Sequence, residues 1–333
     1  MPYALTSSAF PTPAEQTATA ASKLRRRMTA AGAAAALLAL TACGGGAPEG
    51  EEGTGAAGDG QETDLTVVTS IDVYADLVDS IAEGTVETHP IVDSTAVDPH
   101  SYEANARDQL AVRDADVIIA NGGGYDSFIT LLASSADKDD DVYQLIPGEN
   151  WHSHEFDGTY ENEHIWYDLQ RMQEFVLDFA AHLGELAPEN AEFYEANAAE
   201  LAEEIGALAE RNRALETEGM SYFATEAVSG FLLDDAGFEN RTPLEFLAAV
   251  EHGDDVSPRL YNEALGLTEE IDLLSYNPQT ETQQSQRIRH EAEDNDVVVV
   301  EFTETLPDDA EGFVDWMSAN IDLLEESLAE IDA

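Results

Sequence analysis

Two histidines and two glutamates lie beside apolar segments at wide intervals along the sequence, three of them after such a segment and His164 at the start of an expected helix. His100 lies in VDPHSYE, directly after an Asp-Pro pair, and His164 lies in NEHIWYDL. Glu226 comes immediately after the run SYFAT, and Glu304 follows VVVVEF after one intervening residue. Neutral imidazoles and carboxylates are ligands of divalent transition metals, and two glutamates balance the charge of one M²⁺. If the four side chains meet, they predict a metal site; taken singly, a loop histidine or an exposed glutamate remains the alternative.

The elements that must position these residues alternate between strand and helix. Strands are expected over 65–71, 86–92, 116–124 (with its glycine turn), 142–146, 221–225, 271–277 and 297–302. Helices are expected over 74–81, 107–113, 125–133, 166–186, 229–236, 282–292 and 313–331. Strands separated by helices favour parallel sheets with helices on both faces. Ligands bind outside the carboxyl ends of such strands, which is where these histidines and glutamates lie.

An Ala- and Glu-rich segment separates the two alternations and predicts one long helix. At 1.5 Å per residue, this helix would be roughly 40 Å long. The fold class expected is therefore α/β with two lobes, each a parallel-type sheet flanked by helices, joined by one long backbone helix. The boundaries expected are 65–187 for the N-terminal lobe, 188–216 for the linker helix and 217–333 for the C-terminal lobe.

The N-terminal segment has the features of an export signal. A basic cluster, Lys23 and Arg25–Arg27, precedes the apolar run MTAAGAAAALLAL, which ends at Leu-Thr-Ala before Cys43. This ending resembles a lipobox, in which the signal is cut off before the cysteine and the thiol carries lipid. We interpret 1–42 as a lipoprotein-type signal peptide and 43–64 as a flexible Gly/Glu-rich tether. The protein is then extracytoplasmic and anchored to the cell membrane through Cys43, by either the Sec or the Tat route.

Charge is the strongest compositional signal. The chain has 14 basic and 69 acidic residues, and cleavage before Cys43 removes four basic residues and Glu15, which leaves a net charge of −58. Such a surface repels nucleic acid and anionic lipid. At about 1 M salt, however, screening shortens the reach of these charges to about 3 Å. We interpret the charge as a solvated surface adapted to high salt.

Six segments, in order, resemble the zinc- and manganese-binding lipoproteins that feed ABC importers. They are DPHSYEAN, the NGGG turn, NEHIWYDL, ATEAVSGFLLDDAGF, LSYNPQTET and FTETLPDDAEGFVDWM. The resemblance implies that His100 and His164 are ligands from the N-terminal lobe. It places Glu226 where members carry His or Glu, and Glu304 where they carry Asp or Glu. It also implies that Zn²⁺ or Mn²⁺ is the cargo and that an ABC transporter permease in the membrane is the partner. We expect a monomer.

The sequence departs from that family in ways that bear on the metal. Glu rather than His at position 226 favours a manganese-type shell, but zinc binds the same ligands, so both metals stay open. The His-rich loop of zinc-dedicated members is reduced to WHSHEFDGTYENEH, in which His152 and His154 either capture metal transiently or lie in a solvated loop. The alternative functions are a surface metallohydrolase and a metal-dependent adhesin. We do not expect an enzyme, because four protein ligands leave no open position for water on the metal.

Overall fold

The structure is a computed structural model, and it describes residues 60–146 and 161–331. The expected signal peptide, most of the expected tether with Cys43, and the two histidines His152 and His154 lie outside the described residues. In the part of the chain that is described, no helix combines the length and the apolar character needed to cross a membrane.

Four parallel strands form the first sheet, in the order β2-β1-β3-β4. The strands are β1 (Thr66–Ile71), β2 (Glu87–Val92), β3 (Val117–Gly122) and β4 (Val142–Ile146). Every residue of β3 is buried, as expected for a parallel strand covered on both faces. The chain order reverses between β1 and β3, and open α/β sheets bind ligands at this kind of switch point.

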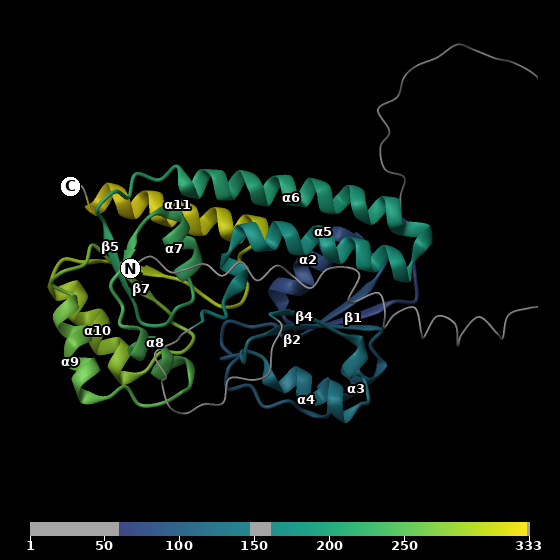
Figure 1. The fold of residues 1–333 in the computed structure, drawn as a ribbon, viewed down its shortest axis with the longest axis horizontal. Helices are drawn as coiled ribbons and strands as arrows, with labels where there is room; N and C mark the ends of the chain where they lie inside the picture. The colour runs from purple at the N-terminus through teal and green to yellow at the C-terminus, as the bar shows by residue number, and fades with distance from the viewer. Residues whose placement is uncertain (1–59, 147–160, 332–333) are drawn as a thin grey trace, which may run out of the picture. The chain divides into compact units, whose positions relative to one another are not determined.

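Helices cover both faces of this sheet, and together they form the N-lobe (Figure 1). The helices α2 (Asp72–Ala82) and α5 (Leu169–Leu186) lie on one side, and α3 (Ala106–Asp114) and α4 (Ser127–Ser135) lie on the other. Val68, Val112, Ile118 and Ile129 are fully buried in one cluster that joins β1, β3, α3 and α4. Short 3₁₀ turns, η1 (Asp139–Asp141) and η2 (Ile165–Tyr167), precede β4 and α5.

The second sheet repeats the first, with the order β6-β5-β7-β8, and forms the C-lobe with its helices. Its strands are β5 (Ser221–Ala224), β6 (Glu239–Asn240), β7 (Leu273–Tyr276) and β8 (Val298–Glu301). The helices are α7 (Gly230–Ala236), α8 (Leu244–Glu251), α9 (Pro258–Leu267), α10 (Gln283–Asp294) and α11 (Phe313–Ile331). Of these elements, β6, α8 and α9 were not expected from the sequence.

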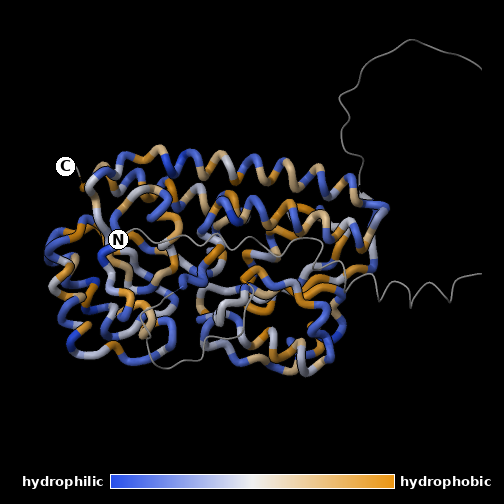
Figure 2. Tube along the Cα trace, in the orientation of Figure 1, coloured by the Kyte–Doolittle hydropathy of each residue, from blue (hydrophilic) through white to orange (hydrophobic). Residues whose placement is uncertain are grey.

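One long helix, α6 (Ala191–Arg213), runs along both lobes (Figure 1). It packs against α2 and α5 of the N-lobe and against α7 and α11 of the C-lobe. The helix begins at Ala191 because the preceding residues form a 3₁₀ turn, η3 (Pro188–Asn190), so it is about 35 Å long rather than 40 Å. Figure 2 shows polar and apolar residues alternating along these helices, as in amphipathic helices that cover a sheet. The expected two-lobed α/β fold is confirmed.

Candidate metal centre

His100 and His164 bring two imidazole rings together between the lobes. Their ring centres are 5.5 Å apart. The side chain of His164 is fully buried and that of His100 is 15% exposed. Among the described residues, the Nε2 atoms of both rings are buried and form no hydrogen bond. A buried polar atom without a partner is costly, so two such nitrogens in one place point to a ligand.

The other ring nitrogen, Nδ1, faces an oxygen in both histidines. His164 Nδ1 lies 2.9 Å from Asn162 Oδ1, and His100 Nδ1 lies 3.2 Å from Glu163 Oε1. An acceptor at Nδ1 favours the tautomer that carries its proton there and leaves the Nε2 lone pair for a metal. Both rings are therefore held in the orientation that a metal ligand needs.

The carboxylates of Glu226 and Glu304 face these nitrogens from the C-lobe. His100 Nε2 lies 3.6 Å from Glu226 Oε1 and 3.3 Å from Glu304 Oε2. His164 Nε2 lies 3.8 Å from the same oxygen of Glu304. Donor atoms around a tetrahedral zinc ion with bonds of about 2.0–2.1 Å lie about 3.3 Å apart. The three contacts that join these four residues thus have a spacing close to that of donor atoms around one divalent cation.

A third carboxylate, that of Glu251, also lies in this site and was not expected from the sequence. His100, His164, Glu226 and Glu251 each offer a donor atom, and these atoms all lie within 4.8 Å of one another. Glu304 is outside this mutually close group, although its Oε2 is nearer to His100 than any oxygen of Glu251. Glu251 ends a helix instead of following a strand, so the strand-end rule did not find it among 69 acidic residues.

Asn277, directly after β7, holds the two predicted carboxylate ligands in place. Its Nδ2 donates to Glu226 Oε2 at 2.5 Å and to Glu304 Oε1 at 2.7 Å. The Thr280 hydroxyl also donates to Glu226 Oε2. In Glu226 these bonds use Oε2 and leave Oε1 facing His100. Outer partners of this kind orient metal ligands and are as much part of a site as the ligands themselves.

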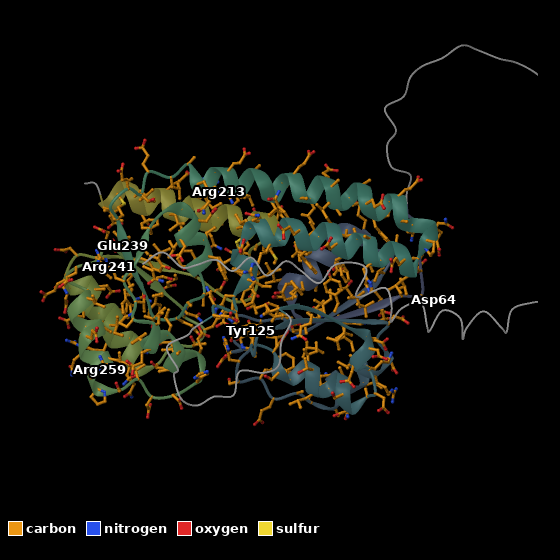
Figure 3. All side chains as sticks on the ribbon, in the orientation of Figure 1. Asp64, Tyr125, Arg213, Glu239, Arg241 and Arg259 are labelled. Carbon is orange, nitrogen blue, oxygen red and sulfur yellow. The ribbon has the colours of Figure 1, made fainter. Side chains whose placement is uncertain are left out.

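A glycine turn after β3 delivers Tyr125 to the centre. Gly122, Gly123 and Gly124 have φ angles of +82°, +72° and +122°, which only glycine adopts readily. A Cβ at Gly122 would also lie 2.3 Å from the carbonyl oxygen of Ile146. The resulting tight turn carries the Tyr125 ring to within 4.7 Å of the His100 ring, centre to centre. Figure 3 shows Tyr125 where the two lobes meet.

Two amide side chains tie the loops of the two lobes together. Asn162, which orients one histidine, donates through Nδ2 to the carbonyl oxygen of Ala227 at 2.8 Å. Gln279 donates to the carbonyl oxygen of Val97 at 3.1 Å, three residues before His100. The Oε1 of Gln279 accepts the backbone N–H of Glu304 at 2.5 Å. The loops of the two lobes that carry the candidate ligands are therefore joined by direct hydrogen bonds.

Charges in the centre are strongly coupled. Burial lowers the pKa of His164 to about 3, so this ring is neutral at pH 7. Burial also lowers the pKa of His100, but the carboxylates of Glu304 and Glu163 outweigh it and hold that pKa well above its usual value. Burial and the charge of Glu304 raise the pKa of Glu226. Burial would raise the pKa of Glu304 too, but the charge of His100 lowers it. A proton on His100 and a divalent cation compete for the same carboxylates.

Solved structures share this fold. The structure of the solute-binding protein (SBP) FpvC from Pseudomonas aeruginosa in complex with Mn²⁺ matches with a TM-score of 0.66 and 22% identity, over 80% of this chain and 99% of that chain. The periplasmic zinc binding protein TroA from Treponema pallidum matches with a TM-score of 0.66 and 20% identity, also over 80% and 99%. At this low sequence identity, the structural similarity establishes a shared fold and nothing further.

Sequence comparison adds two curated relatives and a family. The manganese-binding lipoprotein MntA of Halalkalibacterium halodurans is 32% identical over 162 residues, 48% of this chain and 52% of that protein, so the chain spans about half of its length. The high-affinity zinc uptake system protein ZnuA of Paracoccus denitrificans is 26% identical over 229 residues, 58% and 68% of the two chains. The family of the periplasmic component A of the zinc-uptake complex, ZnuA, matches residues 67–327. Because that match covers most of the sequence and the fold agrees, the chain belongs to this family of extracytoplasmic metal-uptake components.

Proposed function

We propose that this protein captures Zn²⁺ or Mn²⁺ outside the cytoplasm and delivers the ion to the permease of an ABC importer. The proposal rests on two buried Nε2 atoms, of His100 and His164, that form no hydrogen bond among the described residues. They meet the carboxylates of Glu226 and Glu304 between the lobes. The relatives support it, since one is named a manganese-binding lipoprotein and the other a zinc uptake system protein. The family consists of transport components and not of enzymes.

In the proposed complex each lobe supplies two ligands. His100 and His164 give neutral nitrogens from the N-lobe, and Glu226 and Glu304 give oxygens from the C-lobe. Two glutamates neutralise the charge of M²⁺, and each binds through one oxygen or two. Binding therefore links the lobes through the ion as well as through the hydrogen bonds around it.

The proposal extends to the arrangement of the whole chain. Residues 1–42 are a lipoprotein-type signal peptide and 43–64 a tether whose lipidated Cys43 anchors the protein to the cell membrane. The N-terminal lobe spans 65–187, the linker helix 188–216 and the C-terminal lobe 217–333. His152 and His154 assist capture of the ion, and the protein acts as a monomer. Replacing Cys43 by Ser is expected to move the protein from the membrane fraction to the soluble fraction.

Metal analysis of protein purified in zinc-replete and in manganese-replete medium tests the proposal. We expect one ion per chain in at least one of the two media. The variant with both His100→Ala and His164→Ala is the control, and it should retain native far-UV circular dichroism because each lobe keeps its own core. One tightly bound ion in that double variant would show that the proposed shell is wrong.

A further inference from the structure

We propose that Glu251 is a fifth ligand that enlarges the shell towards six donors and thereby favours Mn²⁺ over Zn²⁺. The inference rests on the proposed function, since it concerns the selectivity of the same centre. It adds a residue that neither the strand-end positions nor the family motifs of the sequence assigned to the site.

The position of Glu251 has no explanation in helix stability. It is the last residue of α8, and a negative side chain is unfavourable at the carboxyl end of a helix dipole. Its side chain is only 7% exposed, so the carboxylate also loses most of its hydration. A buried carboxylate beside other buried titratable groups is a candidate for a functional site.

The geometry places one oxygen of Glu251 among the donors. Its Oε2 lies 3.8 Å from His100 Nε2, while Oε1 lies 4.0 Å from His164 Nδ1. On one ion with bonds of about 2.1 Å, adjacent donors of an octahedron lie about 3.0 Å apart and opposite donors about 4.2 Å apart. The separation of Oε2 from His100 Nε2 lies between these two values, and the donor atoms of His100, His164, Glu226 and Glu251 all lie within 4.8 Å of one another. Glu304 adjoins this group through its contacts with the two histidines.

Two further observations, independent of Glu251, point to a ligand in this centre. The side chain of His164 is 0% exposed, and its Nε2 is among the buried atoms that form no hydrogen bond within the described residues. The Nε2 of His100 is likewise buried and forms no hydrogen bond in that part of the chain. The proposed role of Glu251 therefore rests on two imidazoles directed at the same place as well as on a group of carboxylates.

The number of donors decides which metal benefits. Two imidazole nitrogens and three carboxylates give five donors when each carboxylate uses one oxygen, and a sixth when one becomes bidentate. Zinc prefers four ligands, and its intrinsic affinity for nitrogen and oxygen donors exceeds that of manganese. Oxygen-rich octahedral shells suit manganese. A third carboxylate thus offsets the intrinsic advantage of zinc.

Two substitutions separate coordination from charge. Glu251→Gln removes the negative charge, and Glu251→Asp keeps the charge but withdraws the oxygens by one methylene. The matched control is Glu245→Gln, which makes the same change in charge at the other end of α8, where the side chain is 50% exposed. Each protein is titrated with MnCl₂ and with ZnCl₂ at one pH and one ionic strength. Electron spin echo spectroscopy of the Mn²⁺ complexes in D₂O counts the bound waters.

We expect Glu251→Gln and Glu251→Asp each to lose at least tenfold in Mn²⁺ affinity and less than threefold in Zn²⁺ affinity, while Glu245→Gln matches the parent. We also expect one more water on Mn²⁺ in Glu251→Asp than in the parent. An unchanged ratio of the two affinities in both variants, or parent-like manganese binding by Glu251→Asp, overturns the role of Glu251 but leaves metal capture standing. A parent that binds neither metal at one per chain overturns the proposed function and this inference with it.

Discussion

The hydroxyl of Tyr125 in the N-lobe donates a hydrogen bond of 3.1 Å to Oε2 of Glu304 in the C-lobe. The same oxygen faces His100 and His164. Burial and the charge of Glu304 raise the pKa of Tyr125 well above its usual value, so the hydroxyl keeps its proton and remains a donor. One contact therefore both aligns a candidate ligand and joins the two lobes.

Replacing Tyr125 by Phe removes this donor while keeping the ring, whose centre lies 4.9 Å from that of Trp166. We expect metal affinity to fall by about three- to tenfold, because a typical hydrogen bond contributes about 1 kcal/mol. Isothermal titration with Zn²⁺ or Mn²⁺ measures the change. Tyr102→Phe is the control, since that hydroxyl donates to Asp108 within the N-lobe, and its affinity should equal that of the parent. Equal affinities in Tyr125→Phe and the control would show that the contact does not align the ligand.

Glu163 is expected to act on the metal through His100. Its Oε1 lies 3.2 Å from His100 Nδ1, and removing an outer carboxylate of a histidine ligand typically costs about 10- to 100-fold in metal affinity. Glu163→Gln should therefore weaken zinc and manganese by similar factors and lower the pKa of His100, which NMR measures directly. Glu161→Gln, an exposed neighbour with the same change in charge, should do neither. Parent-like affinity with a lowered pKa of His100 would contradict the expectation.

Asp72 predicts a pH dependence of stability that is separate from metal binding. Its Oδ1 accepts the backbone N–H of Leu306 at 3.2 Å, and burial raises its pKa from 3.8 to about 7. Between these two values the folded state binds the proton more tightly than the unfolded state. The contribution of Asp72 to stability is thus full below about pH 4 and is lost as the pH rises through about 7, by at most about 1.4 kcal/mol per pH unit.

The variant Asp72→Asn tests this sign, because Asn carries no titrating proton. In urea unfolding from pH 4 to 8, the stability of the variant relative to the parent should increase with pH up to about 7 and then level off. The control is Asp309→Asn, an exposed change in the same segment as Leu306. Its stability relative to the parent should not follow the pH profile of Asp72→Asn. A difference that decreases with rising pH would mean that the ionised carboxylate stabilises the fold.

The charge of the chain predicts the response to salt. Among the described residues, most arginines lie in exposed ion pairs, such as Arg213 with Asp235 and Arg259 with Glu245, and such pairs contribute little stability. The remaining acidic residues repel one another. The melting temperature should therefore rise between about 0.1 and 1 M KCl, because the screening length falls and the repulsion weakens. The number of tightly bound metal ions should stay at one per chain. Several weak ions that salt displaces would indicate binding to surface carboxylates.

The sequence predicted the fold and three of the four candidate ligands for related physical reasons. Parallel strands end at the same edge of a sheet, so His100, Glu226 and Glu304 could be chosen by their positions after strands. His164 was chosen at the start of a helix, and the resemblance to the family joined the residues of the two lobes. Their role as ligands stays a prediction. The contact of Glu163 with His100 joins residues far apart in the chain and leaves no local pattern.

Glu251 escaped prediction because the helix that carries it lacks the usual signals. The apolar residues of α8 stand together in LEFLAAVE instead of recurring at helical spacing, and no side chain caps its first turn. The two-residue strand β6 before it is too short to be read from alternation. The start of α6 differs from the expected 188 because Pro188 opens a 3₁₀ turn, and proline is also common at the first position of an α-helix.

The packing of α6 against both lobes has a kinetic consequence. Because α6 packs against helices of both lobes, a rotation that separates the lobes must break side-chain packing along this helix. In the proposed complex, exchange of the ion would then depend on the loops at the strand ends, which hydrogen bonds of Tyr125, Asn162 and Gln279 hold in place. If the proposed function holds, we expect those local contacts to set the lifetime of the bound ion, and a permease that displaced one loop would release the ion without a change in the packing of the two lobes.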